Sequence, residues 1–122
     1  MKLRIKGNSI RLRLLRSEVE RFAKEGEISD EISFGTRSLK YSVSISSQAD
    51  SISAEYKGDE ITISIPESAA RQWANSDDVG FETEQSIGDS NLLIVVEKDF
   101  VCLDRPFDPD REDSYPNPSE LC

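Results

Sequence analysis

The chain has 122 residues, with 24 acidic and 15 basic side chains, a formal net charge of −9 and 36% hydrophobic residues. A chain of this length supports one hydrophobic core rather than two. The sequence contains no histidine, which excludes histidine-based triads and histidine metal sites. Its two cysteines, Cys102 and Cys122, are too few for a disulfide scaffold or a cysteine-rich zinc site.

The N-terminal segment alternates basic and apolar side chains, which predicts two half-buried strands. Leu3 and Ile5 are the apolar positions of the first strand, and a turn at Gly7 separates it from the second. A charge at every second position is incompatible with the apolar stretch of a signal peptide. The longest apolar run, Leu92–Val96, is far shorter than the ~20 residues of a membrane span. We therefore expect a cytoplasmic protein without membrane association.

A short helix follows these strands. Ser17 and Glu20 have the spacing of a capping box, and Val19 and Phe22 lie on one helical face. We expect the helix to end near Gly26. Two further strands are predicted at 28–34 and 39–45 because apolar and polar residues alternate there.

The same pattern then recurs with a shift of 51 residues. The matching pairs are Lys6/Lys57, Gly7/Gly58, Ile10/Ile61, Leu12/Ile63, Leu14/Ile65, Ser17/Ser68, Phe22/Trp73, Ala23/Ala74 and Ile28/Val79. In the second unit we expect strands at 52–56, 61–65, 79–85 and 92–100, with a helix at 68–75. The last strand is apolar at every position from 92 to 96, which predicts that both of its faces are covered.

The predicted fold is therefore α+β and mostly β. Two strand–strand–helix–strand–strand units, at about 1–47 and 52–100, form one pseudo-twofold antiparallel barrel or sandwich within a single domain at 1–103. We expect Phe22 and Trp73 to occupy equivalent core positions, and the two helices to close opposite ends. Residues 104–122 contain four of the five prolines and are rich in acidic residues, which predicts an extended tail.

Each unit resembles the swapped-hairpin unit of AbrB- and MazE-type transition regulators and antitoxins. The similarity is carried by the Gly-Asn and Gly-Asp turns, the alternating strands and the Ile65-Pro66-Glu67-Ser68 segment before the second helix. Those proteins build one barrel from two chains, so the resemblance implies that two tandem units build it here from one chain. It also implies nucleic-acid binding as one possible function.

The whole chain also resembles a family of small bacterial proteins of unknown function. The similarity rests on the segments MKLRIKGNSIRLRL at 1–14, VEKDFVCL at 96–103 and YPNP at 115–118. This resemblance implies no particular activity.

The clearest functional feature of the sequence is a charge difference between the two units. The first hairpin carries cations that are predicted to share one face: Lys2, Arg4, Lys6, Arg11 and Arg13, with Arg16 just beyond. The equivalent positions of the second unit are Ser53, Glu55, Lys57, Thr62, Ser64 and Glu67. If the fold alone set these positions, the two copies would be alike. Like charges on adjacent strands repel, so we expect something to offset the repulsion.

Three sources of negative charge could offset this repulsion. The first is intramolecular, from the acidic tail or from the carboxylates Glu82, Glu84, Glu97 and Asp99. The second is a phosphate-bearing anion, and the third is an acidic protein partner. Nucleic acid is disfavoured by the net charge of −9, because binding to phosphates needs a cationic surface.

The sequence has no phosphate-binding glycine loop, nucleophile elbow or paired-carboxylate motif, so it indicates no catalytic residues, metal ligands or cofactor. Our first hypothesis is a monomeric, non-enzymatic interaction domain that uses the basic hairpin and the acidic tail. The main alternative is a barrel that binds or hydrolyses a small phosphorylated compound, and a second is an AbrB-like regulator that binds nucleic acid. These hypotheses differ in the direction of Arg4, Arg11 and Arg13, because cations that converge in a cavity favour a small anion.

Overall fold

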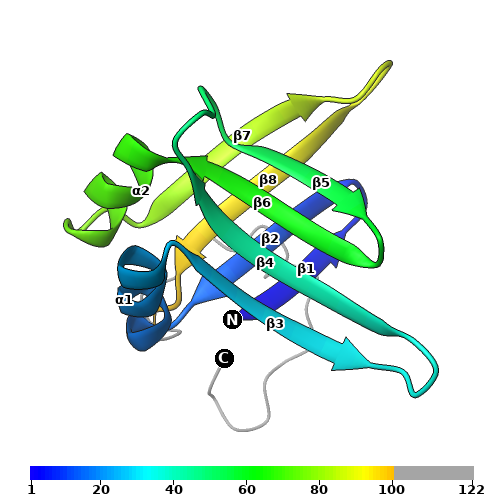
Figure 1. The fold of residues 1–122 in the computed structure, drawn as a ribbon. Coiled ribbons are helices and arrows are strands. Elements are labelled where there is room, and N and C mark those ends of the chain that lie inside the picture. Colours follow the sequence, from blue (N-terminus) through cyan, green and yellow to red (C-terminus); the bar gives the residue numbers. More distant parts are fainter. Residues whose placement is uncertain (101–122) are drawn as a thin grey trace, which may run out of the picture.

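The structure is a computed structural model that describes residues 1–100. Eight strands and two helices follow the predicted order (Figure 1). They are β1 (Lys2–Lys6), β2 (Ser9–Leu14), α1 (Arg16–Glu25), β3 (Glu27–Ser33), β4 (Ser38–Ser46), β5 (Ser53–Lys57), β6 (Glu60–Pro66), α2 (Glu67–Ala74), β7 (Gly80–Ser86) and β8 (Asn91–Lys98). The predicted tail at 104–122, Cys102 and Cys122 lie outside the described residues.

The strands form two four-stranded sheets, and each sheet contains one hairpin from each unit. The first sheet has the order β1-β2-β8-β7, and the second has the order β3-β4-β6-β5. The hairpins are thus exchanged between the two similar units, which confirms the predicted duplication. The sheets face each other as a sandwich and neither closes into a barrel.

One detail of the predicted sheet arrangement is wrong. At the centre of each sheet the exchanged hairpins meet in a parallel pair, β2 with β8 and β4 with β6, whereas the other pairs are antiparallel. In each of these pairs, one strand leads into a helix (β2 or β6), and the other is the second strand of the hairpin that follows the helix of the other unit (β8 or β4). These two strands run in the same direction. Alternation of side chains identifies strands but carries no information on their direction.

The number of residues that separates equivalent positions of the two units changes after the helices. Ile28 pairs with Val43, and Phe81 pairs with Val96, so Phe81 is the counterpart of Ile28. The constant shift of 51 had matched Ile28 with Val79, which is wrong. The chain from Trp73 to Phe81 is two residues longer than the equivalent chain from Phe22 to Ile28, so the shift becomes 53.

A single core lies between the sheets and under both helices. Its centre is aromatic: Phe22 and Trp73 are almost fully buried, and their rings meet edge to face at 5.9 Å. Phe81 also packs against Trp73, with the ring centroids 5.4 Å apart. The indole Nε1 of Trp73 donates a hydrogen bond to the carbonyl oxygen of Val79 (3.1 Å). Phe22 and Trp73 therefore occupy equivalent core positions, and the indole also satisfies its polar group.

The two helices lie side by side at one end of the sandwich and do not close opposite ends as expected (Figure 1). Arg71 of α2 donates from Nη1 to the carbonyl oxygen of Ala23 in α1 (2.5 Å). The helices share this end because β2 and β6, the strands that precede them, both finish here. Among residues 1–100, no helix lies at the other end of the sandwich (Figure 1).

The start of α1 also differs from the predicted capping box. The helix begins at Arg16, and the backbone N–H of Leu15 donates to the Glu18 carboxylate at 2.8 Å. Glu18 therefore takes the position that the sequence pattern had given to Glu20. The end of the helix is as predicted, because Gly26 has φ 83° and its N–H donates to the carbonyl oxygen of Phe22.

Candidate functional site: the charged outer face of the first sheet

The basic side chains of the first hairpin project away from the core. On β2, Leu12 and Leu14 are fully buried, and Arg11 and Arg13 alternate with them on the opposite side. Antiparallel pairing then sets Lys2 beside Arg13 and Arg4 beside Arg11. The cations of β1 and β2 are thus neighbours on the outer face of an open sheet. Arg16 is separate from them, because it lies in the first turn of α1.

The other two strands of this sheet place carboxylates on the same outer face. Arg13 is in register with Glu97 on β8, and Arg11 is in register with Val95, which is paired in turn with Glu82 on β7. Glu84 lies one alternate position farther along β7. We call the outward side chains of β1, β2, β8 and β7 the charged face. It is cationic on β1 and β2 and acidic on β7 and β8.

Glu97 and Asp99 are carboxylates of the described residues that contact the cations directly. Glu97 Oε1 accepts a hydrogen bond from Arg13 Nε at 2.8 Å and lies 3.5 Å from Arg11 Nη1. Asp99 Oδ2 lies 3.0 Å from Lys2 Nζ. The side chains of Arg13 and Glu97 are each 18% exposed, so this ion pair is partly screened from water.

The remaining expected counterparts lie on the far edge strand. Glu82 and Glu84 are exposed on β7, and Glu84 Oε2 is 3.5 Å from Asn91 Nδ2. The structure therefore brings Glu97 and Asp99 to the cations and sets Glu82 and Glu84 on the opposite border of the same face.

The charged face contains a hollow that the sequence analysis did not identify. It has a volume of about 240 Å³ and is lined by Arg11, Val79, Gly80, Glu82, Val95 and Glu97, with Phe81. A Cβ atom on Gly80 would lie 2.1 Å from the carbonyl oxygen of Val96, so no side chain can stand beside Glu97 at this point. The signal in the sequence was a glycine at the start of a strand, which is typical of a close backbone approach.

The outer face of the second sheet is different in chemistry. It is dominated by hydroxyl side chains: Ser29, Ser42, Ser44, Ser53, Thr62 and Ser64. The hydroxyl of Ser42, which is 1% exposed, donates to Glu60 Oε2 (3.2 Å) and lies 3.4 Å from Thr62 Oγ1. Lys40 Nζ lies 3.7 Å from Glu60 Oε2. On this face, opposite charges lie beside each other on neighbouring strands, as in the pairs Glu31/Lys40 and Lys57/Glu60, rather than on opposite halves of the sheet.

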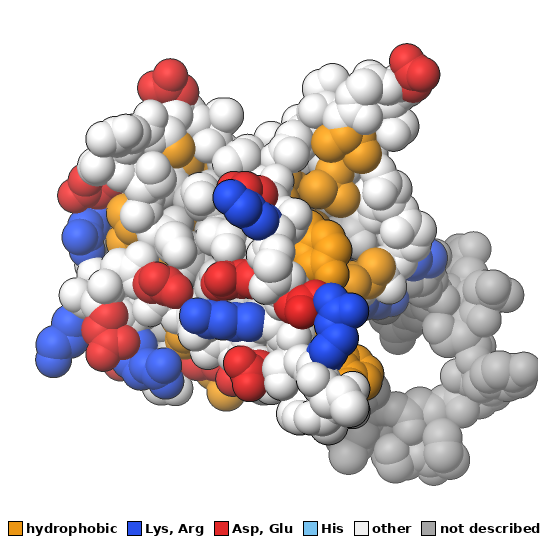
Figure 2. All heavy atoms as spheres, turned by 45° about the vertical axis from the view of Figure 1, so that its right-hand side comes forward, with side chains coloured by type: hydrophobic (Ala, Val, Ile, Leu, Met, Phe, Trp, Pro, Cys, Tyr) orange, Lys and Arg blue, Asp and Glu red, His pale blue; other side chains and the backbone are white. Residues whose placement is uncertain are grey.

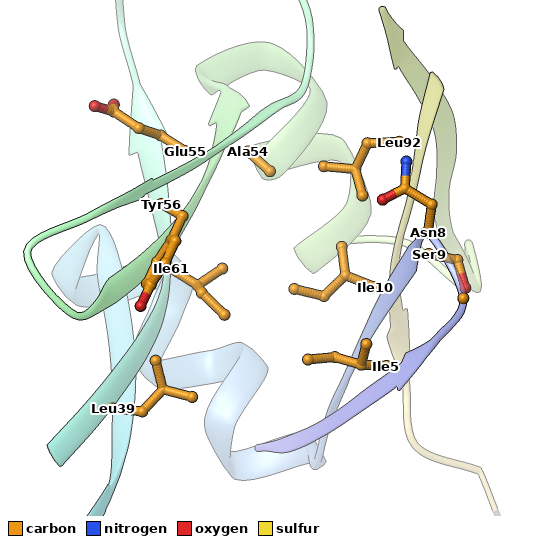
Figure 3. A pocket seen from close by; sticks show the side chains of 11 residues that line it. Ile5, Asn8, Ser9, Ile10, Leu39, Ala54, Glu55, Tyr56, Ile61 and Leu92 are labelled. Carbon is orange, nitrogen blue, oxygen red and sulfur yellow. The ribbon is translucent and has the colours of Figure 1, made fainter. Parts of the chain in front are cut away.

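A second hollow lies between the sheets at the end without helices. Ile5, Ile10 and Leu92 of the first sheet point toward Leu39, Tyr56 and Ile61 of the second (Figure 3). The hollow has a volume of about 330 Å³. Figure 2 turns this end forward and shows hydrophobic side chains gathered between two projecting parts of the surface. Alternation indicated that these apolar side chains share one face of their strands, but it could not predict that residues 1–100 place no helix over this end.

Two groups with shifted pKa values lie where β1 meets the second sheet. Burial raises the pKa of the Tyr41 phenol, and the nearby charges of Asp30 and Glu18 raise it further. Burial lowers the pKa of the Met1 amino group, but hydrogen bonds to Glu18 and Asp30 outweigh burial, and that pKa is raised as well. The Tyr41 hydroxyl donates to the Met1 carbonyl oxygen (3.4 Å), so these polar groups connect the start of β1 to β4.

Comparison with known proteins gives a family for this sequence. One family model matches residues 1–119, which is nearly the whole chain. The chain belongs to the family of unknown function DUF7009. The match continues beyond the described sheets into the acidic C-terminal segment. No curated protein and no solved structure matches the chain.

The family match confirms the predicted membership of a small family of unknown function and carries no activity. The resemblance to AbrB- and MazE-type proteins stays a prediction. Within residues 1–100, no helix is long and apolar enough to cross a membrane.

Proposed function

We propose that this protein is an interaction domain that binds an acidic segment of a protein partner on the cationic side of the charged face. The observation that carries the proposal is the direction of Arg11 and Arg13. They project from an open sheet, while their neighbours Leu12 and Leu14 fill the core. An open sheet surface fits a macromolecular partner better than a small molecule, which needs a concave site.

A small phosphorylated ligand is the weaker alternative. Such a ligand would need cations that converge in a cavity. The hollow on the charged face is lined by Arg11 but also by the carboxylates Glu82 and Glu97, which repel a phosphate. Among residues 1–100, the hollow between the sheets is lined mainly by aliphatic side chains such as Ile10 and Ile61 and by no Lys or Arg. A carbohydrate phosphate or nucleotide placed there would lose its water without gaining a charge partner.

Nucleic acid is also less well supported than a protein. A duplex or single strand that covered the cations of β1 and β2 would bring its phosphates toward Glu82, Glu84 and Glu97 on the same face. The net charge of the whole chain, −9, adds a long-range repulsion. A protein segment can match the face more closely, because it can carry carboxylates over β1 and β2 and apolar side chains over Val95.

The test is titration of the protein with a fluorescent poly-glutamate peptide and with a single-stranded oligonucleotide of equal charge. The six carboxylates of 104–122 are replaced by amides in the titrated chain, so that competition between them and the acidic probe does not enter this test. This amide variant combines Asp104→Asn, Asp108→Asn, Asp110→Asn, Glu112→Gln, Asp113→Asn and Glu120→Gln.

We expect the amide variant to bind the peptide more tightly than the oligonucleotide, with an affinity that falls as salt rises. Adding Arg4→Gln and Arg11→Gln should weaken peptide binding by about tenfold. The matched control adds Lys40→Gln and Lys57→Gln on the second sheet, which removes the same charge and should leave binding nearly unchanged. Absence of peptide binding, or an equal loss in the control, would overturn the proposal; tighter oligonucleotide binding would favour the nucleic-acid alternative.

A further inference from the structure

The chain continues for 22 residues beyond the described part, and this segment is complementary in charge to the first hairpin. Residues 101–122 carry six acidic and two basic side chains, whereas residues 1–24 carry two acidic and eight basic side chains. The segment also contains two aromatic residues, Phe107 and Tyr115. It therefore has both chemistries that the charged face requires of an occupant.

The segment starts beside this face. β8 ends at Lys98, whose N–H donates to the carbonyl oxygen of Val79 at the rim of the hollow (2.9 Å). The next residue, Asp99, donates its N–H to the carbonyl oxygen of Leu14 and forms the ion pair with Lys2. The chain thus leaves the first sheet at its helix end, already in contact with both β2 and β1.

The length of the segment is sufficient to cover the face. Four strands at ~4.8 Å spacing span roughly 14 Å, and a five-residue strand is roughly 17 Å long. Twenty-two residues reach roughly 70 Å when extended. A tethered segment also has an effective concentration of about millimolar at its own surface, which favours it over a second copy of the chain.

We propose that residues 101–122 dock on the charged face, with their carboxylates beside the cations of β1 and β2 and an aromatic side chain in the hollow beside Val95. The hollow suits an aromatic ring, because Val79 and Val95 supply apolar contacts and Arg11 supplies a cation for the ring face. The acidic segment then holds the surface that we assign to the partner, so a partner must displace it. This last step rests on the proposed function, whereas the docking does not.

The docking is tested in the full chain with a nitroxide label on Cys122, after Cys102→Ser removes the other thiol. We expect NMR signals of backbone amides in β1, β2 and β8 to broaden, and those of β4 and β6 to stay sharp as an internal control. The six amide substitutions should reduce the broadening strongly. Broadening that is absent, or equal on both sheets, would overturn the docking.

The aromatic contact has its own variants. Phe107→Ala and Tyr115→Ala are made separately in the labelled chain, and we expect one of them to reduce the broadening near Val95. If neither does, the hollow is not the site of an aromatic side chain.

The consequence for function is tested with the poly-glutamate probe. We expect the unmodified chain to bind it about tenfold more weakly than the amide variant. Equal affinity of the two chains would overturn displacement while leaving the proposed function intact. Broadening on the first sheet without probe binding by the amide variant would leave the docking intact and overturn the proposed function.

Discussion

The outer faces of the two sheets occupy equivalent places in a duplicated fold, yet they share little chemistry. In the first sheet, Arg4, Arg11, Val95 and Glu82 form a row across four strands. The equivalent row of the second sheet consists of Glu55, Thr62, Ser42 and Ser29. The inner faces, in contrast, are alike, with Leu12 and Val96 matching Ile63 and Val43.

The difference separates what the fold requires from what it permits. Inner positions are restrained by packing against the other sheet, so both copies keep apolar residues there. Outer positions are restrained little by packing, and the second sheet shows that hydroxyl side chains are sufficient for folding. The adjacent cations on β1 and β2 cost stability through repulsion, and this is the physical reason for connecting them with binding.

The largest expected effect is a loss of stability on truncation of the two equivalent aromatic residues of the core. Trp73→Ala should lower the free energy of unfolding by about 3–5 kcal/mol, and Phe22→Ala by less. Trp73 is the larger ring, packs on both Phe22 and Phe81 and also loses the hydrogen bond to Val79. Urea denaturation of the two variants measures the difference. A smaller loss for Trp73→Ala would show that the two core positions are not filled as described.

The next effect concerns equivalent positions at the start of β7 and β3. Gly80→Ala should destabilise the protein by about 1–3 kcal/mol, because the added Cβ would lie 2.1 Å from the carbonyl oxygen of Val96. The control is Glu27→Ala, at the equivalent position of the second sheet, where a side chain is already accommodated. Thermal or urea denaturation compares them. Equal stability of both variants would contradict the close approach at Gly80.

A smaller effect tests the charge separation itself. Glu97→Gln should cost about 1 kcal/mol, because it weakens the contacts to Arg13 and Arg11 without changing the shape of the side chain. Glu82→Gln, on the border of the same face, is the matched control and should cost less. The difference between the two variants, measured by urea denaturation at low salt, should shrink when salt is added. A larger cost for Glu82→Gln would contradict the described ion pair.

The smallest expected effect concerns a position at which the inner faces of the two sheets differ. The second sheet has Tyr41 there, and the first sheet has Ile94. Burial and nearby carboxylates raise the pKa of the Tyr41 phenol above its ordinary value of 10. The folded state therefore prefers the neutral phenol, so this contribution to stability is complete below about pH 10 and is lost as the pH rises through the folded pKa. Ultraviolet titration should show one late phenol transition that disappears in Tyr41→Phe. Persistence of that transition in the variant would contradict the assignment.

The order and type of the elements followed from the sequence alone. Side-chain alternation, the glycine turns and the repeated Phe22 and Trp73 positions are local signals, and they predicted eight strands, two helices and two similar units. The direction of the basic side chains stayed open in the sequence, because either face of a sheet can be in contact with water, and the burial of Leu12 and Leu14 in the structure decided it. The acidic counterparts were predicted only as a group, because a pairing across β8 depends on contacts 84 or more residues apart.

Other features were decided only by the tertiary structure. The parallel pairs at the centre of each sheet, the two helices at one end and the shift from 51 to 53 all depend on how the hairpins exchange between units. The hollow beside Gly80 depends on the approach of two backbones. Local sequence fixes which side of a strand is apolar, because that is set within two residues. Which strand lies next to which, and what space remains between them, is set by the packing of the whole chain.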